Sequence, residues 1–157
     1  MRRSELDETD RRLLAELQRD AGEPATALAR RLGISASQCA RRIKRLESEG
    51  YIRRRVALLD GAKLGCGVVV FISVALKSQS DDVARDFEAA VRGHPSVTEL
   101  YWMNGTYDFL LKFVAADLAD FRRFLEETLT RHEGVDHIQS FFAVKEAKYE
   151  TGVPFQE

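Results

Sequence analysis

The sequence predicts an α+β protein in which an N-terminal winged helix-turn-helix domain is followed by a ferredoxin-like βαββαβ domain. Two observations lead to this prediction. Apolar residues recur at helical spacing through residues 6–50, and they alternate at strand spacing in several segments after residue 66. Between these parts, Asp60 to Gly65 (DGAKLG) is rich in turn residues and indicates a boundary. We therefore expect a helical domain over 1–60, a linker over 61–66 and the ferredoxin-like domain over 67–157.

Charge is distributed unevenly along the 157 residues. The formal net charge is only −1, but residues 1–60 carry 14 Lys and Arg against 10 Asp and Glu, and residues 61–157 carry 10 against 15. The window 30–55 holds nine basic and two acidic residues. Such asymmetry is typical of a basic interaction module joined to an acidic one, and it favours nucleic acid as a partner of the first domain.

Three short amphipathic helices are expected in the first domain. Asp7 or Thr9 can cap the first, and Gly22 ends it. Pro24 suits the first turn of the second, ATALARRLG, which Gly33 ends. A three-residue turn then leads to the third, which extends from Ser35 to Gly50. This spacing is the helix-turn-helix pattern, whose second helix enters the major groove of double-stranded DNA.

The helix from Ser35 to Gly50 has an apolar back and a basic front. Ser35 and Gln38 have the spacing of a capping box, and Gly50 can close the helix in the left-handed conformation. Cys39 and its apolar neighbours face the core. A basic front can also be a merely solvated surface, but the surrounding helix-turn-helix pattern favours DNA contact. The front consists of Ser37, Gln38, Arg41, Lys44, Arg45 and Ser48, with Arg42 on its flank.

Residues 51–59 read as a strand or wing beside this helix. Arg53, Arg54 and Arg55 are consecutive there, and they suit the phosphate backbone or a minor groove. A solvated charged strand is the alternative interpretation.

The second domain combines strands and helices in the order β-α-β, hairpin, β-α-β. Two helices cover only one face of such a sheet. We therefore expect the other face to be an apolar patch that forms a homodimer, with Val69, Phe71, Leu100, Trp102 and Phe142 or their alternates exposed on it. The predicted strands are 68–77, 97–103, 107–114 and 135–147, the predicted helices are 81–92 and 117–131, and Asn104-Gly105 is the hairpin signal.

The two cysteines, Cys39 and Cys66, have no metal-ligand spacing and form no disulfide framework. No apolar run reaches the ~18 residues that a membrane helix needs, and residues 1–10 lack a signal-peptide core. We expect a cytoplasmic protein without membrane contact.

Several stretches resemble the Lrp/AsnC family of bacterial and archaeal transcription regulators. They are LDxxDRxLLxxLxxD from Leu6, LARRLGIS from Leu28, SxxQCxRRIKRLExEGYI from Ser35 and HPxVxExYxxxGxYDFLL from His94. The resemblance implies a nucleoid-associated, sequence-specific regulator that needs no cofactor. It also implies a homodimer that assembles further to an octamer, and an amino-acid effector that controls activity or assembly.

The residue pattern and the resemblance together assign two sets of site residues. The DNA-contacting set comprises Ser35, Ser37, Gln38, Arg41, Arg42, Lys44, Arg45, Arg53, Arg54 and Arg55. The effector set comprises the loop Asn104, Gly105, Thr106, Tyr107 and Asp108 together with Leu118, Phe141 and Phe142. In that loop, Gly105 would let backbone N–H groups face a carboxylate, and Asp108 could pair with an α-ammonium group. Asp108 could equally only cap the hairpin, and the last three residues could be plain core.

An enzyme is the main alternative, because Lrp-like proteins include sirohaem decarboxylases that use histidines. His94, His132 and His137 share no metal-ligand spacing, and no catalytic motif is present, so we expect neither catalytic residues nor a metal site. A ligand-independent architectural DNA-binding protein is the other alternative.

Overall fold

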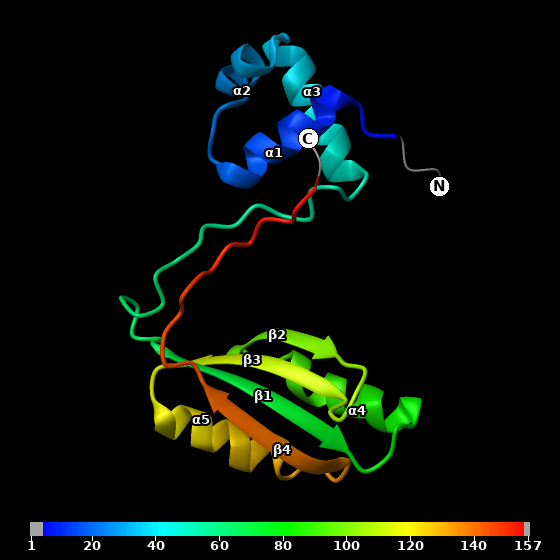
Figure 1. Ribbon diagram of the computed structural model, residues 1–157, viewed down its shortest axis with the longest axis vertical. Helices are drawn as coiled ribbons and strands as arrows, with labels where there is room; N and C mark the ends of the chain where they lie inside the picture. Colours follow the sequence, from blue (N-terminus) through cyan, green and yellow to red (C-terminus); the bar gives the residue numbers. More distant parts are fainter. Residues whose placement is uncertain (1–4, 156–157) are drawn as a thin grey trace. The chain divides into compact units, whose positions relative to one another are not determined.

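The computed structural model describes residues 5–155, and they form two compact units (Figure 1). One unit contains the residues up to Leu58 together with those from Lys148 onward, and the other contains Leu59–Ala147. The predicted domain limits differ from this division at the C-terminus, where Val153 contacts Gln18 of the first unit. The Gln18 side-chain amide donates to the Val153 carbonyl at 3.0 Å and accepts from its N–H at 2.9 Å. No helix among the described residues is long and apolar enough to span a membrane.

Three helices, α1 (Glu8–Arg19), α2 (Ala25–Leu32) and α3 (Ala36–Ser48), form the first unit. Gly33 ends α2 with φ +69°, a conformation that costs glycine no steric strain. The helices bury one small core of apolar side chains, and Cys39 lies in it with no exposed surface, as predicted. This core contains Leu13, Leu17, Leu28, Ala29, Leu32, Cys39 and Leu46.

The strand expected over residues 51–59 is not formed in the described chain. After α3, residues 51–60 contain two bends and otherwise irregular backbone. A strand needs a neighbour to accept its backbone hydrogen bonds, and no other strand of the first unit is described. Arg53, Arg54 and Arg55 are consequently exposed on an irregular segment.

The second unit is a four-stranded antiparallel sheet with the strand order β2-β3-β1-β4, as a ferredoxin-like fold requires. Its last helix runs from α5 into a π-helical turn, η1, and Asp117 caps it by accepting from two backbone N–H groups at 2.8 and 2.9 Å. The elements are β1 (Val68–Leu76), α4 (Asp81–Arg92), β2 (Val97–Trp102), β3 (Phe109–Ala115), α5 (Leu118–Phe124), η1 (Leu125–Leu129) and β4 (Val135–Phe142).

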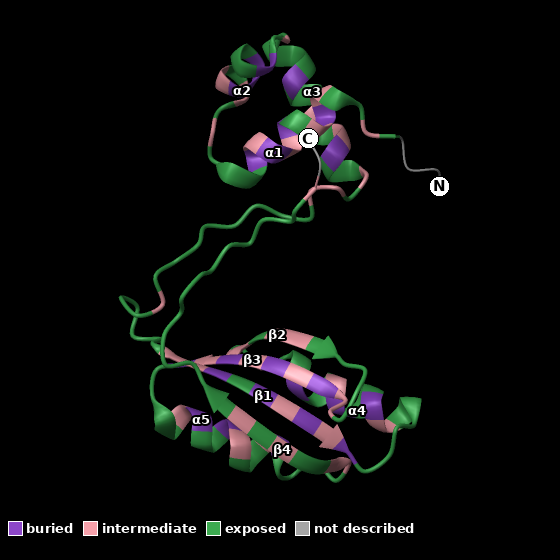
Figure 2. Cartoon of the chain, in the orientation of Figure 1, coloured by how far each residue is buried: buried purple, intermediate pink, exposed green. Residues whose placement is uncertain are grey.

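Both helices lie behind the sheet, so no other element of the second unit covers its front face (Figure 1). The alternate positions of β1 from Val70 to Leu76 are buried against the helices, and those of β3 from Phe109 to Ala115 are buried with them (Figure 2). We call the uncovered side the open face. By strand register it carries Val69, Phe71, Ser73, Ala75, Glu99, Tyr101, Leu110, Lys112, Val114, His137, Gln139 and Phe141.

Three residues predicted on the open face lie on the helix side instead. Leu100 is paired with buried Leu111 and packs against the core. The Trp102 ring meets Phe109 edge-on at 5.2 Å, and the Phe142 ring meets Phe121 edge-on at the same distance. The prediction was right for Val69 and Phe71, and the alternates Tyr101, Leu110 and Phe141 complete the face. Residues alternate between the two faces as predicted. Which residues of β2 and β4 face the helices is set by the pairing of these strands with β3 and β1.

Strand ends also differ from the prediction, because strands end where their partners end. β4 stops at Phe142 and not at residue 147, since the Ala143 N–H makes the last bond to β1, at 2.9 Å from the Val69 carbonyl. The hairpin between β2 and β3 is present, but its loop is 103–108, longer than a two-residue Asn-Gly turn. Met103 closes this loop by donating to the Asp108 carbonyl at 2.8 Å.

The two βαβ halves repeat one turn. After α4, the His94 ring accepts from the Ser96 N–H through Nδ1 at 3.2 Å. After η1, the His132 ring accepts from the Gly134 N–H through Nδ1 at 3.1 Å. Each turn starts the following strand, so both histidines have a structural task.

Candidate DNA-contacting and effector sites

The cap of α3 is the capping box that the sequence predicts. The Gln38 N–H donates to the Ser35 hydroxyl at 3.2 Å, and the Ser35 N–H donates to the Gln38 side-chain carbonyl at 3.0 Å. The Ser37 hydroxyl lies 3.1 Å from that of Ser35. The Gln38 carbonyl oxygen is therefore engaged in the cap, so Gln38 is not free to contact an adenine with both its groups.

Around its axis, α3 presents three sectors. Cys39 and Leu46 face the core. At 3.6 residues per turn, Arg42 and Arg45 lie next to each other on a second side. Ser37, Arg41 and Lys44 lie on the third, and all three are exposed. Neither Arg41 nor Lys44 forms an ion pair with another described residue, so their charges are available to a partner.

Arg42 and Arg45 are held by the first turn of α1. The Arg42 Nη1 atom lies 2.7 Å from an oxygen of Asp7 and 2.7 Å from an oxygen of Asp10, and Arg45 Nη2 binds the other oxygen of Asp10. Hydrogen bonds to both carboxylates raise the pKa of Arg42. Arg41, Arg42, Arg45 and Asp7 line a hollow of about 270 Å³. The predicted phosphate contacts of Arg42 and Arg45 therefore compete with bonds inside the protein.

Asp10 was missed by the sequence interpretation. It is the buried charged residue of the described chain, with no exposed surface. One signal could have indicated it, since Asp10 lies three residues before Leu13 and seven before Leu17, on the apolar stripe of its helix. A carboxylate on such a stripe needs a buried cation as partner, and the arginine-rich third helix is the available source.

The three arginines after α3 are exposed, and one has a partner. Arg55 Nη2 lies 2.8 Å from a Glu47 oxygen. Arg53 and Arg54 form no ion pair with another described residue.

On the core side of α3, burial raises the pKa of the Cys39 thiol, which keeps the thiol neutral.

The loop predicted to bind an effector is anchored at the end of β1. An Asp108 carboxylate oxygen accepts from the Leu76 N–H at 2.7 Å, and the Asp108 N–H donates to the Val74 carbonyl at 2.9 Å. The Tyr107 hydroxyl donates to the Gln139 side chain, and its ring stacks on His137 at 6.2 Å. Asp108 therefore has the structural role that the sequence left open as an alternative, and its second oxygen has no hydrogen bond to another described residue.

The eight predicted effector residues do not gather within one chain. Residues 104–108 lie at the end of β1 near Leu76, and Phe142 is paired with Val70, roughly 20 Å away along the strand. Leu118, which is 62% exposed, starts α5 at that same far end. Phe141 and Phe142 point to opposite faces of the sheet, as successive strand residues must.

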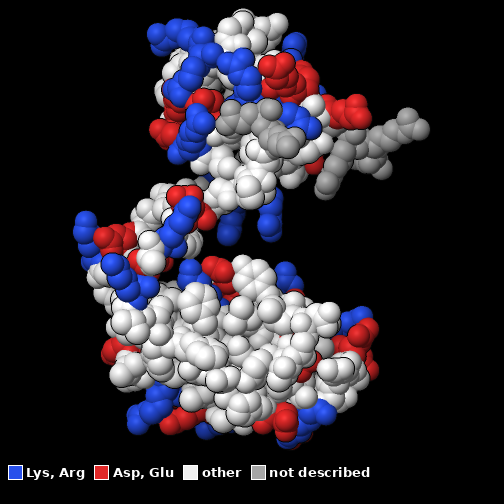
Figure 3. Space-filling model, in the orientation of Figure 1, with Lys and Arg blue, Asp and Glu red and all other residues white. Residues whose placement is uncertain are grey.

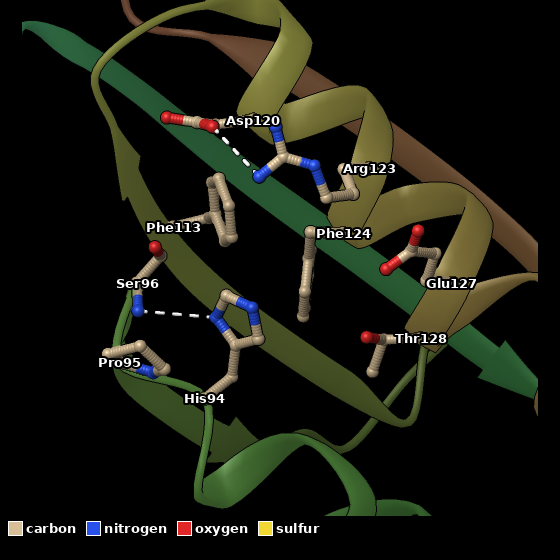
Figure 4. Close-up of a pocket in the computed structure, with 9 residues that line it drawn as sticks. All are labelled: His94, Pro95, Ser96, Phe113, Asp120, Arg123, Phe124, Glu127 and Thr128. Carbon is tan, nitrogen blue, oxygen red and sulfur yellow. Dashed lines mark hydrogen bonds and ion pairs between the residues drawn. The ribbon is translucent and has the colours of Figure 1, made fainter.

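A cavity of about 300 Å³ lies between the α4–β2 turn and α5, and none of the predicted effector residues lines it (Figure 4). The His94 ring packs against Phe124 and Phe113, with ring centres 4.6 and 5.8 Å apart. Arg123 is paired with Asp120 at 3.2 Å, so its charge is already compensated. The remaining lining residues are Pro95, Ser96, Glu127 and Thr128.

The histidines do not converge on one site. His132 Nε2 lies 3.2 Å from an Asp86 oxygen, His94 belongs to the α4–β2 turn and His137 stacks on Tyr107. Within residues 5–155, no three His, Cys, Asp or Glu side chains are grouped as metal ligands would be.

Comparisons with known proteins agree with both parts of this architecture. Residues 6–53 match a winged helix-turn-helix DNA-binding family, and residues 69–153 match the Lrp/AsnC ligand binding domain. The chain belongs to the Lrp/AsnC family. It is a DNA-binding transcriptional regulator that carries a ligand-binding domain.

Relatives of this Lrp/AsnC protein cover almost its whole length. A leucine-responsive regulatory protein from Rhizobium meliloti is 42% identical over 93% of this chain and 94% of its own. A glutamate uptake regulatory protein from Zymomonas mobilis is 35% identical over 97% and 92%. These relatives are named as regulators and not as enzymes.

Solved structures show the same fold. An AsnC family transcriptional regulator from Agrobacterium tumefaciens has a TM-score of 0.88 and 38% identity, covering 95% of this chain and 97% of its own. A transcriptional regulator from Neisseria meningitidis, solved as a complex with L-Met, has a TM-score of 0.89 and 36% identity, covering 96% and 97%.

Proposed function

We propose that this regulator contacts DNA through the exposed stripe of α3, with Arg41 as its main base-contacting residue. The observation that carries this proposal is that Arg41 and Lys44 are exposed and form no ion pair in the described chain, although the neighbouring Arg42 and Arg45 are neutralised. Ser37 lies on the same stripe near the helix N-terminus, the part that approaches base edges in helix-turn-helix proteins. Arg53 and Arg54 contact the phosphate backbone.

Two substitutions separate base contacts from phosphate contacts. Arg41→Ala should lower the ratio of operator affinity to random-DNA affinity by about 10-fold or more, because a bidentate arginine–guanine pair contributes about 1–3 kcal/mol. Arg54→Ala should weaken both affinities alike and reduce the salt slope by about one unit. The operator is first selected from a random duplex library with the unmodified protein. If neither substitution alters DNA binding, the assignment of α3 is wrong.

An amino acid is the proposed effector, and the loop at residues 104–108 is its proposed site. The L-Met complex of the Neisseria meningitidis regulator supports the ligand class. The exposed Asn104, Gly105 and Thr106 offer backbone N–H groups, and one Asp108 oxygen has no hydrogen bond to another described residue. Since Leu118, Phe141 and Phe142 lie at the far end of the sheet, they would have to come from another copy of the chain.

The effector proposal is tested by titrating the twenty amino acids into the protein in a calorimeter. Binding should be restricted to a few of them and should be lost in Asp108→Asn, which keeps the size of the side chain but removes the charge that would pair with an α-ammonium group. Glu133→Gln is the control, because it removes an exposed carboxylate outside the loop. Uniform absence of heat would favour a ligand-independent architectural protein.

The proposed assembly is a homodimer through the open face that associates further, up to an octamer. Seen from the open side, the sheet is nearly free of charged side chains, which lie around its rim (Figure 3). Phe71, Tyr101 and Phe141 are 38%, 50% and 49% exposed there. Large apolar surface of this kind usually marks an interface, and paired helix-turn-helix units read two-fold related half-sites. We place the assembled protein in the cytoplasm, on the nucleoid.

A further inference from the structure

The buried carboxylate of Asp10 joins the first helix to the DNA-contacting helix. Its two oxygens have different cations: Oδ1 binds Arg42 Nη1 at 2.7 Å and Oδ2 binds Arg45 Nη2. The Asp7 N–H also donates to Oδ2 at 3.2 Å. An ionised carboxylate with no exposed surface is tolerated only when it is paired and hydrogen-bonded. The two arginines therefore compensate this charge and are committed to it.

The second carboxylate of the cluster, Asp7, has a different character. Its side chain is 52% exposed, and it reaches only Arg42, at 2.7 Å. Its other oxygen accepts from the Asp10 N–H at 2.7 Å, which caps α1. Asp7 can therefore lose its charge without leaving a buried cation unpaired, since Asp10 still binds Arg42.

The guanidinium group of Arg45 is held by the protein. Its Nε atom is buried and has no hydrogen-bond partner among the described residues, although its Nη2 atom binds Asp10. A DNA phosphate or base cannot use a donor that is turned inward. In contrast, Arg41 is exposed on the neighbouring side of the same helix and forms no ion pair within residues 5–155.

We infer that Asp10 is a positioning residue for DNA recognition: through Arg42 and Arg45 it fixes the rotation of α3 about its axis, so that Ser37, Arg41 and Lys44 face the groove. This inference rests on the proposed function of α3. The Asp10 carboxylate binds two arginines that are three residues apart on α3. Two such bonds restrain the rotation of a helix about its axis, whereas a single bond does not. Arg42 and Arg45 thus set the docking of the helix and do not read base edges.

Asp10→Asn tests the inference in the full-length protein, because it keeps the shape of the side chain and removes the charge that holds both arginines. Affinity is measured for the selected operator and for random duplex of equal length, over a range of salt concentrations. The operator-to-random ratio should fall about 10-fold or more, and the affinity for random DNA should be unchanged or higher, because Arg45 loses its carboxylate and Arg42 keeps only that of Asp7. Far-UV circular dichroism and urea unfolding establish the folded fraction.

Asp7→Asn is the matched control. It removes one charge from the same cluster and keeps the oxygen that caps α1. Both DNA affinities should rise together, by less than about 3-fold each, and their ratio should stay the same. A fall in the ratio as large as that of Asp10→Asn would show that general charge balance, and not the fixed rotation, determines recognition, which would overturn the inference.

Arg45→Lys covers the case in which Asp10→Asn does not fold. It keeps the positive charge but not the planar fork, so the ratio should fall while the salt slope is retained. An unchanged ratio in a folded Asp10→Asn or Arg45→Lys protein would limit Asp10 to a role in stability and overturn the inference. If Arg41→Ala also leaves DNA binding unaltered, the proposed function itself fails, so the two failures are distinguishable.

Discussion

Asp7 belongs to the capping box that starts α1, and its carboxylate is held there by hydrogen bonds. Burial alone raises the pKa of Asp7, but hydrogen bonds from the Asp10 N–H and the Arg42 guanidinium outweigh it and hold the pKa below its ordinary value of 3.8. A lowered carboxyl pKa contributes stability above the ordinary value, and this stability is lost as the pH falls through the folded-state value.

The first unit should therefore lose stability in acid partly through Asp7. Between about pH 5 and about pH 2, the free energy of unfolding of the wild type should fall more steeply than that of Asp7→Asn, which has no carboxyl group to protonate at this position. The difference should be small, because Asp7 is half-exposed. Urea unfolding at a series of pH values measures it. Parallel curves for the two proteins would contradict the prediction.

Gly134 is required for space and not for backbone conformation, since its φ is not positive. A Cβ atom there would lie 2.7 Å from Val83 Cγ1 and 3.1 Å from the His132 ring. Gly134→Ala should therefore destabilise the second unit by about 1–3 kcal/mol. Gly93→Ala, after α4, is the control, because nothing lies within 4 Å of the added Cβ and it should be neutral or slightly stabilising. Thermal unfolding of the two variants compares them.

At the scale of elements, the start of α3 depends on its capping box. Ser35→Ala should reduce the free energy of unfolding of the first unit by about 1 kcal/mol, because the Gln38 N–H loses its acceptor. Ser35→Asn should retain stability and DNA binding. Ser35→Asp should retain stability but weaken DNA binding, since it adds a negative charge beside the exposed stripe. Equal DNA affinity for the Asn and Asp variants would place the helix start away from DNA.

Elements whose signals are local could be predicted from the sequence, and those that depend on partners could not. α4 has its predicted bounds, Asp81–Arg92, and the Ser35–Gln38 cap is confirmed, because both follow from spacing and end residues. The ends of β4 and the phase of β2 depend on which strand lies beside them. Likewise, Asp108 forms its bond to Leu76 across 32 positions of sequence, which no local pattern indicates.

The candidate sites follow the same division. Spacing placed Arg41, Lys44 and Arg45 on one basic front with Arg42 on its flank, and the structure divides them differently because Asp10 lies on another helix. Helical spacing alone gives the neighbours on a helix surface, but it does not say which of them meet an acidic residue from elsewhere in the chain. From the sequence alone, Arg42 and Arg45 were consequently predicted to contact phosphates.

At the scale of the whole molecule, the open face is the side of the sheet that α4 and α5 leave uncovered. Phe71 and Phe141 are paired neighbours on it. Phe71→Glu should weaken self-association by at least about 100-fold, because a charge buried in an interface without a partner costs several kcal/mol. The folded monomer tolerates the carboxylate, since Phe71 is 38% exposed there. Ala89→Glu, which adds the same charge to the exposed side of α4, should associate as the wild type does.

Sedimentation equilibrium over a range of concentrations measures the association of both variants. Because two helix-turn-helix units on one assembly contact two half-sites, loss of the dimer should also weaken binding to a two-half-site operator much more than binding to a single half-site. Phe71→Glu should therefore approach the affinity that the wild type has for one half-site. If Phe71→Glu associates as tightly as Ala89→Glu, the copies meet elsewhere, and the open face must have a different partner.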